Sequence, residues 1–221
     1  MQRSPGGAGA EKLGLADAMR DRTRSLHLQA EQSGIIREIL HGRASRGRYV
    51  LYLRNLLPAY EQLETGIEKQ RHLPALAGMA RREIYRSSAL RSDLEALGGA
   101  DWKTSVPVLS AAARYADRIA LAARGNGTRL LAHAYTRYLG DLNGGAVLGR
   151  ILARTLALEP GARAFYAFPL IADLNLFIKE YRQSFDSAGC KIADFDDVLG
   201  EAEAAFRDNI EVSREVLKTT Y

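Results

Sequence analysis

The sequence predicts an all-α protein, a multi-helix bundle in a single domain. Apolar residues recur three and four positions apart along nearly the whole chain, which is the spacing of one face of an α-helix. Convincing alternation of apolar and polar residues, the mark of a half-buried strand, is absent. The chain has 221 residues, of which 47% are hydrophobic and 26% are charged. A chain of this length and composition can bury a substantial core.

Eight helical segments follow from the spacing of apolar residues and from the residues that interrupt it. In chain order they are residues 11–32, 34–41, 45–69, 80–97, 109–124, 128–157, 170–187 and 194–219. The second ends near His41-Gly42. The third contains Pro58, which removes one backbone donor and is expected to kink the helix without ending it.

The later helices end where backbone chemistry favours a break. Gly98-Gly99 ends the fourth helix, and Gly125-Asn126-Gly127 separates the fifth from the sixth. Glu159-Pro160-Gly161 ends the sixth. The seventh is recognised by one apolar face, made of Leu170, Leu174, Ile178, Tyr181 and Phe185. Connections between helices are therefore short, as expected for residues 11–221 forming one domain.

The N-terminal residues 1–10, MQRSPGGAGA, are expected to form a flexible tail, because they lack the apolar region of a signal peptide. Arg or Lys interrupts every apolar run before it reaches the roughly 18 residues of a membrane span. The single cysteine, Cys190, has no partner for an intramolecular disulfide or a cysteine-based metal motif. We therefore expect a cytoplasmic protein without a membrane anchor.

The formal charge of +5 and the isoelectric point near 9.4 are compatible with nucleic acid, an acidic protein or an anionic ligand as partner. Lys and Arg are scattered among Asp and Glu, however, so the charge favours none of these strongly. We expect no nucleic-acid partner.

The segment from Leu130 to Leu158 is strongly helical in pattern and yet carries four glycines, Gly140, Gly144, Gly145 and Gly149. Each costs about 1 kcal/mol relative to alanine inside a helix, so some other interaction must offset the cost. One explanation is close packing of helices through small residues. The other is a bent helix whose backbone lies against a flat ligand. The glycines alone leave both open.

Two sequence segments together carry a family resemblance. Residues 133–149, HAYTRYLGDLNGGAVLG, resemble the distal helix of haem oxygenases, and Ser25–Glu31, SLHLQAE, resembles their proximal segment. The resemblance extends over about residues 12–217. It implies a haem oxygenase fold in which haem, both substrate and cofactor, lies between these two helices and is opened to biliverdin, carbon monoxide and ferrous iron.

The resemblance also implies roles around the distal helix. The glycines, Gly140 and Gly144 among them, would let the helix lie directly over haem, and Asp141 would organise water as a controlled proton donor. Arg137 and Tyr60 match positions that extend this polar network. Read without the resemblance, they are a surface arginine and a core tyrosine. Asn143 departs from the family pattern, which more often has serine there.

His27 is the expected axial ligand of the iron. Arg20, Arg24, His27 and Glu31 follow steps of four, three and four residues and so share one stripe of the first helix. Glu31 is placed to accept a hydrogen bond from the imidazole and so orient it. A lone helical histidine is more often a packed or exposed residue, and the resemblance is what favours ligation. His133 is expected to pack or hydrogen-bond.

Basic residues are expected to hold the two haem propionates. The resemblance places Arg20 and Arg24 on the first helix, where the family often has lysine, and Arg182 on the seventh. Lys179 is offset by about one position from the family spacing, so a solvated helix face is the simpler interpretation of it. Tyr135 is a further candidate for propionate contact.

The implied reaction needs dioxygen and an external electron donor such as ferredoxin, flavodoxin or a reductase, since no flavin, nicotinamide or iron–sulfur motif is present. Two alternatives remain open at this point. One is a haem carrier, sensor or store that binds through His27 without turnover. The other is a related helical bundle that acts on another small molecule.

Overall fold

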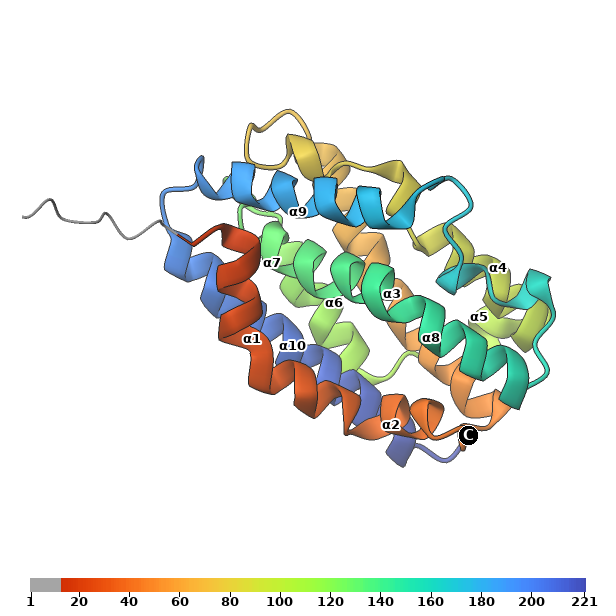
Figure 1. Cartoon of the computed structure of the whole chain (residues 1–221). Coiled ribbons are helices and arrows are strands. Elements are labelled where there is room, and N and C mark those ends of the chain that lie inside the picture. Colours follow the sequence, from red (N-terminus) through yellow and green to blue (C-terminus); the bar gives the residue numbers. More distant parts are fainter. Residues whose placement is uncertain (1–12) are drawn as a thin grey trace, which may run out of the picture.

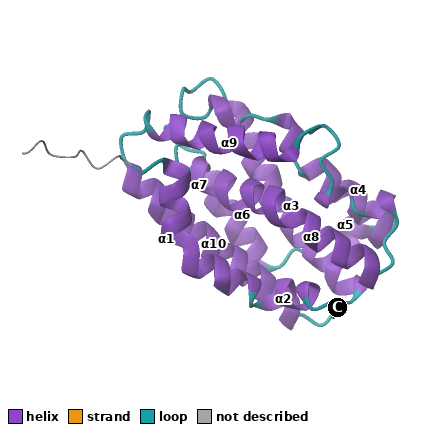
Figure 2. Cartoon of the chain, viewed as in Figure 1, coloured by secondary structure: helices purple, strands orange, loops and turns teal. Residues whose placement is uncertain are grey.

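The computed structural model describes residues 13–221, and the expected tail at residues 1–10 lies outside them. Within this range the chain forms helices and loops and no strand (Figure 2). The helices are α1 (Leu15–Glu31), α2 (Gly34–Leu40), α3 (Arg46–Gln70), α4 (Ser87–Gly98), α5 (Trp102–Ser105), α6 (Ser110–Ala122), α7 (Leu130–Ala134), α8 (Gly140–Thr155), α9 (Leu174–Gly189) and α10 (Phe195–Lys218). The all-α prediction is confirmed.

Short helical turns complete the chain. The 3₁₀ turns are η1 (Ala77–Met79), η2 (Arg82–Ile84), η4 (Pro160–Ala162) and η5 (Ala164–Tyr166), and a π-helical segment, η3 (Tyr135–Leu139), joins α7 to α8. The predicted helix 128–157 is therefore one helical run of three parts. The short helix α5 was not predicted. Helix α3 continues through Pro58.

Three predicted helices begin later than their periodicity suggests, and each has a tertiary or local cause. Helix α1 begins at Leu15, where Asp186 of α9 accepts the backbone N–H of Ala16 at 3.0 Å. Helix α4 begins at Ser87, because Glu64 of α3 accepts the backbone N–H groups of Arg86 and Ser87.

Helix α9 begins at Leu174 instead of residue 170. The Asp173 side chain accepts the backbone N–H of Leu176 at 2.9 Å as the N-cap, which fixes the start of the helix there. Leu170, assigned to the apolar face from sequence, is 73% exposed.

The packing of the helices separates α1 from α8. Helix α3 packs against α4 and α6, while α10 packs against α1, α2, α6 and α7. Helix α1 is held by α10, α9 and α2, and helix α8 is held by α2, α9 and η5. The two helices thus share α2 and α9 as neighbours without comparable packing on each other (Figure 1).

Two buried charged side chains hold the segment 164–168: Arg86, the N-cap residue of α4, and Asp93 within α4. The Asp93 carboxylate, fully buried, accepts the backbone N–H groups of Ala164 at 2.7 Å and Phe165 at 2.9 Å. Arg86, which is 5% exposed, donates to the carbonyls of Phe165 and Ala167. These bonds satisfy backbone groups that the short 3₁₀ turn η5 leaves without partners of its own.

Replacing Asp93 with alanine is expected to lower the free energy of unfolding by about 2–4 kcal/mol, because two buried N–H groups lose their acceptor. Urea denaturation followed by circular dichroism measures the change. Asp101→Ala, at an exposed carboxylate without a side-chain cap bond, is the matched control and should stay within about 0.5 kcal/mol of wild type. Equal stability of the two variants would show that the Asp93 bonds to the 164–165 backbone do not stabilise the fold.

Candidate active site

Helices α1 and α8 carry residues that the sequence singles out. His27 on α1 is exposed, with 56% of its side chain open to solvent. On α8, a Cβ added to Gly140 or Gly144 would meet no atom within 4 Å. A side of α8 that faces open space and lacks side chains fits a flat ligand, which a Cβ at either position would obstruct.

The four glycines of α8 fall into two pairs with different surroundings. A Cβ on Gly145 would lie 3.1 Å from the Tyr166 ring, and one on Gly149 would lie 3.0 Å from Tyr166 Cβ. Close packing therefore explains these two. Gly140 and Gly144 have no such neighbour, so close packing does not explain them and the ligand explanation stays a prediction for these two.

The π-helical segment η3 sits directly before Gly140. Its wider turn adds one residue to the helix, and such insertions are frequent at functional sites. Within it Thr136, Arg137, Tyr138 and Leu139 are buried, whereas the next residue, Gly140, is exposed. The run α7–η3–α8 thus presents buried polar groups on one side and bare backbone on another.

Asp141, Tyr60 and Arg137 form one buried hydrogen-bonded group. The Tyr60 hydroxyl donates to Asp141 Oδ2, and Arg137 donates to the same hydroxyl oxygen through Nε at 3.0 Å and Nη2 at 2.8 Å. Arg137 Nη2 also lies 3.8 Å from Asp141 Oδ1. From α10, Asn209 accepts a bond from Arg137 Nη1. The structure therefore brings three candidates from α3, η3 and α8 together.

Burial and charge oppose one another in this group. Burial raises the pKa of Asp141, while the charge of Arg137, the bond from Tyr60 and the charge of Arg86 work against that rise. Burial also raises the pKa of Tyr60 well above its ordinary value, so the phenol keeps its proton as a donor. Although burial alone would lower the pKa of Arg137, Tyr60 and Asp141 hold it well above its ordinary value.

Arg86 is a member of this environment that sequence reasoning missed. Its charge reaches Asp141, and its guanidinium lies 4.2 Å from the centre of the Phe168 ring. Phe168 and Tyr166 line a cavity of about 190 Å³ beside Asp141. Arg86 thus acts on the charge of Asp141 and also packs on Phe168, which forms part of the cavity wall beside that carboxylate. No local sequence pattern marks Arg86, because its contacts are made by long-range folding.

His27 is oriented as expected for its stripe. Its Nδ1 lies 3.5 Å from Glu31 Oε1, which leaves Nε2 for another partner. The ring also packs near Phe206 of α10, with ring centres 5.9 Å apart. An exposed imidazole with one nitrogen near a carboxylate and an aromatic neighbour is suited to bind a metal from one side.

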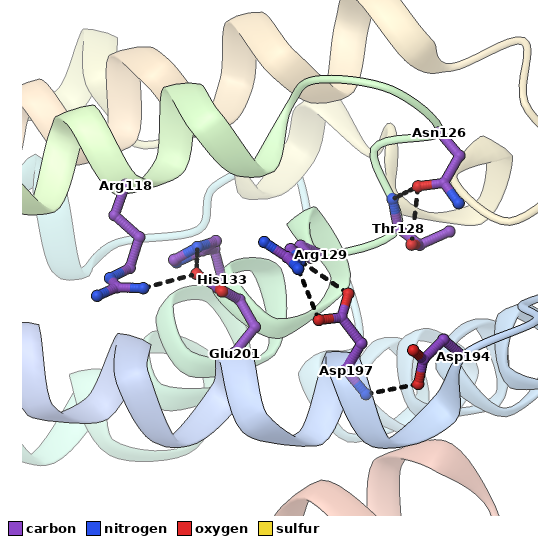
Figure 3. Close-up of polar contacts among 8 residues, drawn as sticks. All are labelled: Arg118, Asn126, Thr128, Arg129, His133, Asp194, Asp197 and Glu201. Atoms are coloured by element: carbon purple, nitrogen blue, oxygen red, sulfur yellow. Dashed lines mark hydrogen bonds and ion pairs between the residues drawn. The ribbon is translucent and has the colours of Figure 1, made fainter.

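His133 takes no part in this open face. It is fully buried, and its Nε2 lies 3.0 Å from Glu201 Oε1 of α10. Figure 3 shows Glu201 between His133 and Arg118, whose Nη1 is 3.6 Å from the same carboxylate. Burial alone would raise the pKa of Glu201, but these two neighbours and Arg129 hold it below its ordinary value. The prediction that His133 packs or hydrogen-bonds is confirmed.

Cationic candidates gather where α1 meets α9. Arg182 Nη2 lies 2.6 Å from Asp17 Oδ1, and Arg20 Nη1 lies 3.1 Å from the same oxygen. Tyr135 is partly buried, and burial raises its pKa, while a bond with Thr23 and the charges of Arg182 and Arg20 work against that rise. Asp17, which the sequence reasoning did not single out, therefore holds two of the arginines at one place.

Two other cationic candidates lie apart from this cluster. Arg24 is 70% exposed and pairs with Asp21 at 2.7 Å. Lys179 is exposed and forms no ion pair with any residue of 13–221. The interpretation of Lys179 as part of a solvated helix face fits this placement.

In the described part of the chain, no helix is long and apolar enough to cross a membrane.

Comparison with known proteins bears on the whole chain. Residues 13–215 match the sequence model of the family described as Heme oxygenase. The chain is 35% identical over 205 residues to Heme oxygenase 1 of Homo sapiens, which covers 91% of this chain and 71% of the human protein.

Solved structures agree with the sequence comparison. Heme oxygenase-1 of Synechocystis sp. PCC6803, solved in complex with heme, matches with a TM-score of 0.84 at 31% identity and covers 92% of each chain. The heme oxygenase of Leptospira interrogans matches with a TM-score of 0.86 at 32% identity, over 92% of this chain and 100% of that one. With its whole helical run matched in sequence and in fold, this chain belongs to the heme oxygenase family.

Proposed function

We propose that this haem oxygenase binds its substrate between α1 and α8 and opens it to biliverdin, carbon monoxide and ferrous iron through the residues assembled there. The observation that carries the proposal is the side-by-side placement of a bare glycine face and a buried carboxylate on α8. The glycines admit a flat ring, and the carboxylate next to them supplies acid–base chemistry. A protein that only carries haem needs no such buried acid.

His27 is proposed to bind the iron from the α1 side, with Glu31 orienting the imidazole. When bound, haem supplies the iron on which dioxygen is reduced, and it is also the molecule that is oxidised. Glu31 takes the Nδ1 side of the ring, so Nε2 is the nitrogen left to the metal.

On the opposite side, Asp141 is proposed to organise water and pass protons to the oxygen end of the reaction. Its carboxylate receives the Tyr60 proton in a hydrogen bond, and Arg137 holds the Tyr60 oxygen in place. Because Asn209 fixes Arg137 from α10, the carboxylate has little freedom to turn away. A fixed donor acting through water delivers protons at a controlled position.

Arg20, Arg182 and Tyr135 are proposed to hold the propionates at the end where α1 meets α9. Asp17 keeps the two guanidinium groups together there. Arg pairs with carboxylates through two parallel bonds, so it fixes orientation as well as charge. Arg24 and Lys179 are proposed to add positive charge at the rim of the site.

Electrons are proposed to come from a separate donor such as ferredoxin, flavodoxin or a reductase, and oxygen from dissolved dioxygen. A positively charged rim favours encounter with an acidic electron-transfer protein. We further propose a cytoplasmic location, since Cys190 is free and exposed, which suits a reducing compartment.

Replacing His27 with alanine is expected to remove the iron–imidazole bond while haem still enters the site. The absorption spectrum of the reconstituted variant should lose the features of histidine ligation, and added imidazole should restore part of the turnover. His41→Ala, at an exposed histidine whose Nδ1 bonds to the Arg37 carbonyl, serves as the control. An unchanged ligation spectrum in His27→Ala would remove His27 from the metal site.

Replacing Asp141 with asparagine is expected to lower biliverdin yield by about 10²-fold or more, because the side chain keeps its size and loses its acid–base function. Haem should still bind with His27 as ligand, and peroxidase-like oxidation of added phenols should rise. Product chromatography and a peroxidase assay measure the two outcomes. Asp117→Asn, at an exposed carboxylate of α6, should behave as wild type. A wild-type biliverdin yield in folded, haem-bound Asp141→Asn would refute the assignment.

Replacing Arg182 with alanine is expected to weaken haem binding modestly or to mix the biliverdin isomers, because a loosened propionate allows the ring to rotate. Haem titration and isomer chromatography test this. Arg114→Ala, at an exposed arginine of α6 that has no proposed role in the site, should change neither quantity. Identical affinity and isomer composition in Arg182→Ala would make this arginine an ordinary surface charge.

A further inference from the structure

A row of tyrosine rings leads from the catalytic carboxylate to the surface. The Tyr60 ring lies 6.1 Å from that of Tyr138, centre to centre, and the Tyr138 ring is stacked 6.2 Å from that of Tyr85. Tyr60 and Tyr138 are fully buried, whereas Tyr85 is partly exposed. The three rings come from α3, η3 and the loop before α4, so the fold and not local sequence assembles them.

The hydroxyls at the two ends of the row each have a carboxylate acceptor. Tyr60 donates to Asp141, and Tyr85 donates to Glu68 Oε1 at 3.0 Å. The Tyr138 hydroxyl, in the middle, is buried and has no hydrogen-bond partner within the described chain. The bond from Arg82 holds the pKa of Glu68 below its ordinary value, so this carboxylate is ionised and is an anionic acceptor for the Tyr85 hydroxyl.

This arrangement matters because a phenol gives up an electron readily only when its proton can leave at the same time. Tyr60 and Tyr85 meet that condition and Tyr138 does not. A tyrosyl radical is therefore stabilised on Tyr60 or on Tyr85. The Tyr138 ring mediates electron transfer between them and does not lose its own proton. Stacked and tilted aromatic rings at these separations provide the electronic contact.

We propose that Tyr60, Tyr138 and Tyr85 form a relay that carries one oxidising equivalent from the haem site to the protein surface, where a small one-electron reductant removes it. The relay goes beyond haem cleavage. It protects the distal residues when hydrogen peroxide oxidises the haem-bound protein and no haem carbon is attacked.

The steps balance in electrons and protons. Tyr60 gives one electron to the oxidant in the haem site and its phenolic proton to Asp141. It then regains an electron from Tyr85 through the Tyr138 ring and takes its proton back from Asp141. Tyr85 gives its own proton to Glu68. A surface reductant such as ascorbate returns the electron to Tyr85, and Glu68 returns the proton.

Tyr181 provides an internal comparison. Its ring lies 6.5 Å from that of Tyr138, but it is fully buried and its hydroxyl also lacks a partner in residues 13–221. It offers neither a proton acceptor nor an exit to solvent, so we assign it no part in the relay.

The test treats the haem-loaded protein with hydrogen peroxide in the presence of a nitroso spin trap, and peptide mass spectrometry then locates the trapped radical. In wild type the adduct should form on Tyr85 in preference to Tyr221, although Tyr221 is 47% exposed and accessible to any diffusing oxidant. Tyr138→Phe should lower the Tyr85 adduct several-fold, because the middle phenol is replaced by a ring that is much harder to oxidise. Tyr181→Phe should leave it unchanged.

Haem binding and biliverdin yield are measured on the same samples, so failure of the relay is distinguishable from failure of the active site. Tyr85→Phe should keep the biliverdin yield of wild type with an external reductase and should lose activity faster when peroxide is added. A Tyr85 adduct that persists in Tyr138→Phe, or labelling that follows exposure and favours Tyr221, would overturn the relay.

Discussion

The buried contact among Asp141, Tyr60 and Arg137 is the interaction on which the arrangement of the site depends. A carboxylate and a guanidinium removed from water cost several kcal/mol each, and the cost is offset only if geometry and hydrogen bonds are complete. Here the Tyr60 hydroxyl donates to Asp141 and accepts from Arg137, so it hydrogen-bonds to both charged groups. Asn209 accepts a further guanidinium N–H. Loss of any partner leaves a buried charge uncompensated, which ties α3, η3, α8 and α10 to one another.

A second constraint is the space beside α8. Two glycines leave the helix backbone bare there, while two others let Tyr166 pack closely on the neighbouring side. The same helix therefore has to be packed tightly against η5 and open at Gly140 and Gly144. The bonds from Asp93 and Arg86 contribute to this arrangement. They hold the segment 164–168 from the α4 side, and its η5 turn packs against α8 on the other.

Much of this fold and part of the site could be predicted from sequence, because the relevant signals are local. Apolar spacing located the helices, and the resemblance of residues 133–149 to haem oxygenases predicted the distal side. Four contributors could not be found this way, namely Asp17, Arg86, Asp186 and Asn209. Their partners are remote: Asp17 meets Arg182 across 165 positions, and Arg86 meets Ala167 across 81. No periodicity within one helix reports such contacts.

The exposed face of α1 has a consequence for the lifetime of the protein. His27 Nε2 forms no hydrogen bond or ion pair within residues 13–221, so bound substrate adds an interaction that only the folded chain can make. Such a ligand stabilises the folded state by RT ln(1 + [L]/Kd). The enzyme is therefore a sensor of its own supply: chains that hold substrate resist proteolysis, and chains that have finished their turnover become the ones a protease removes first.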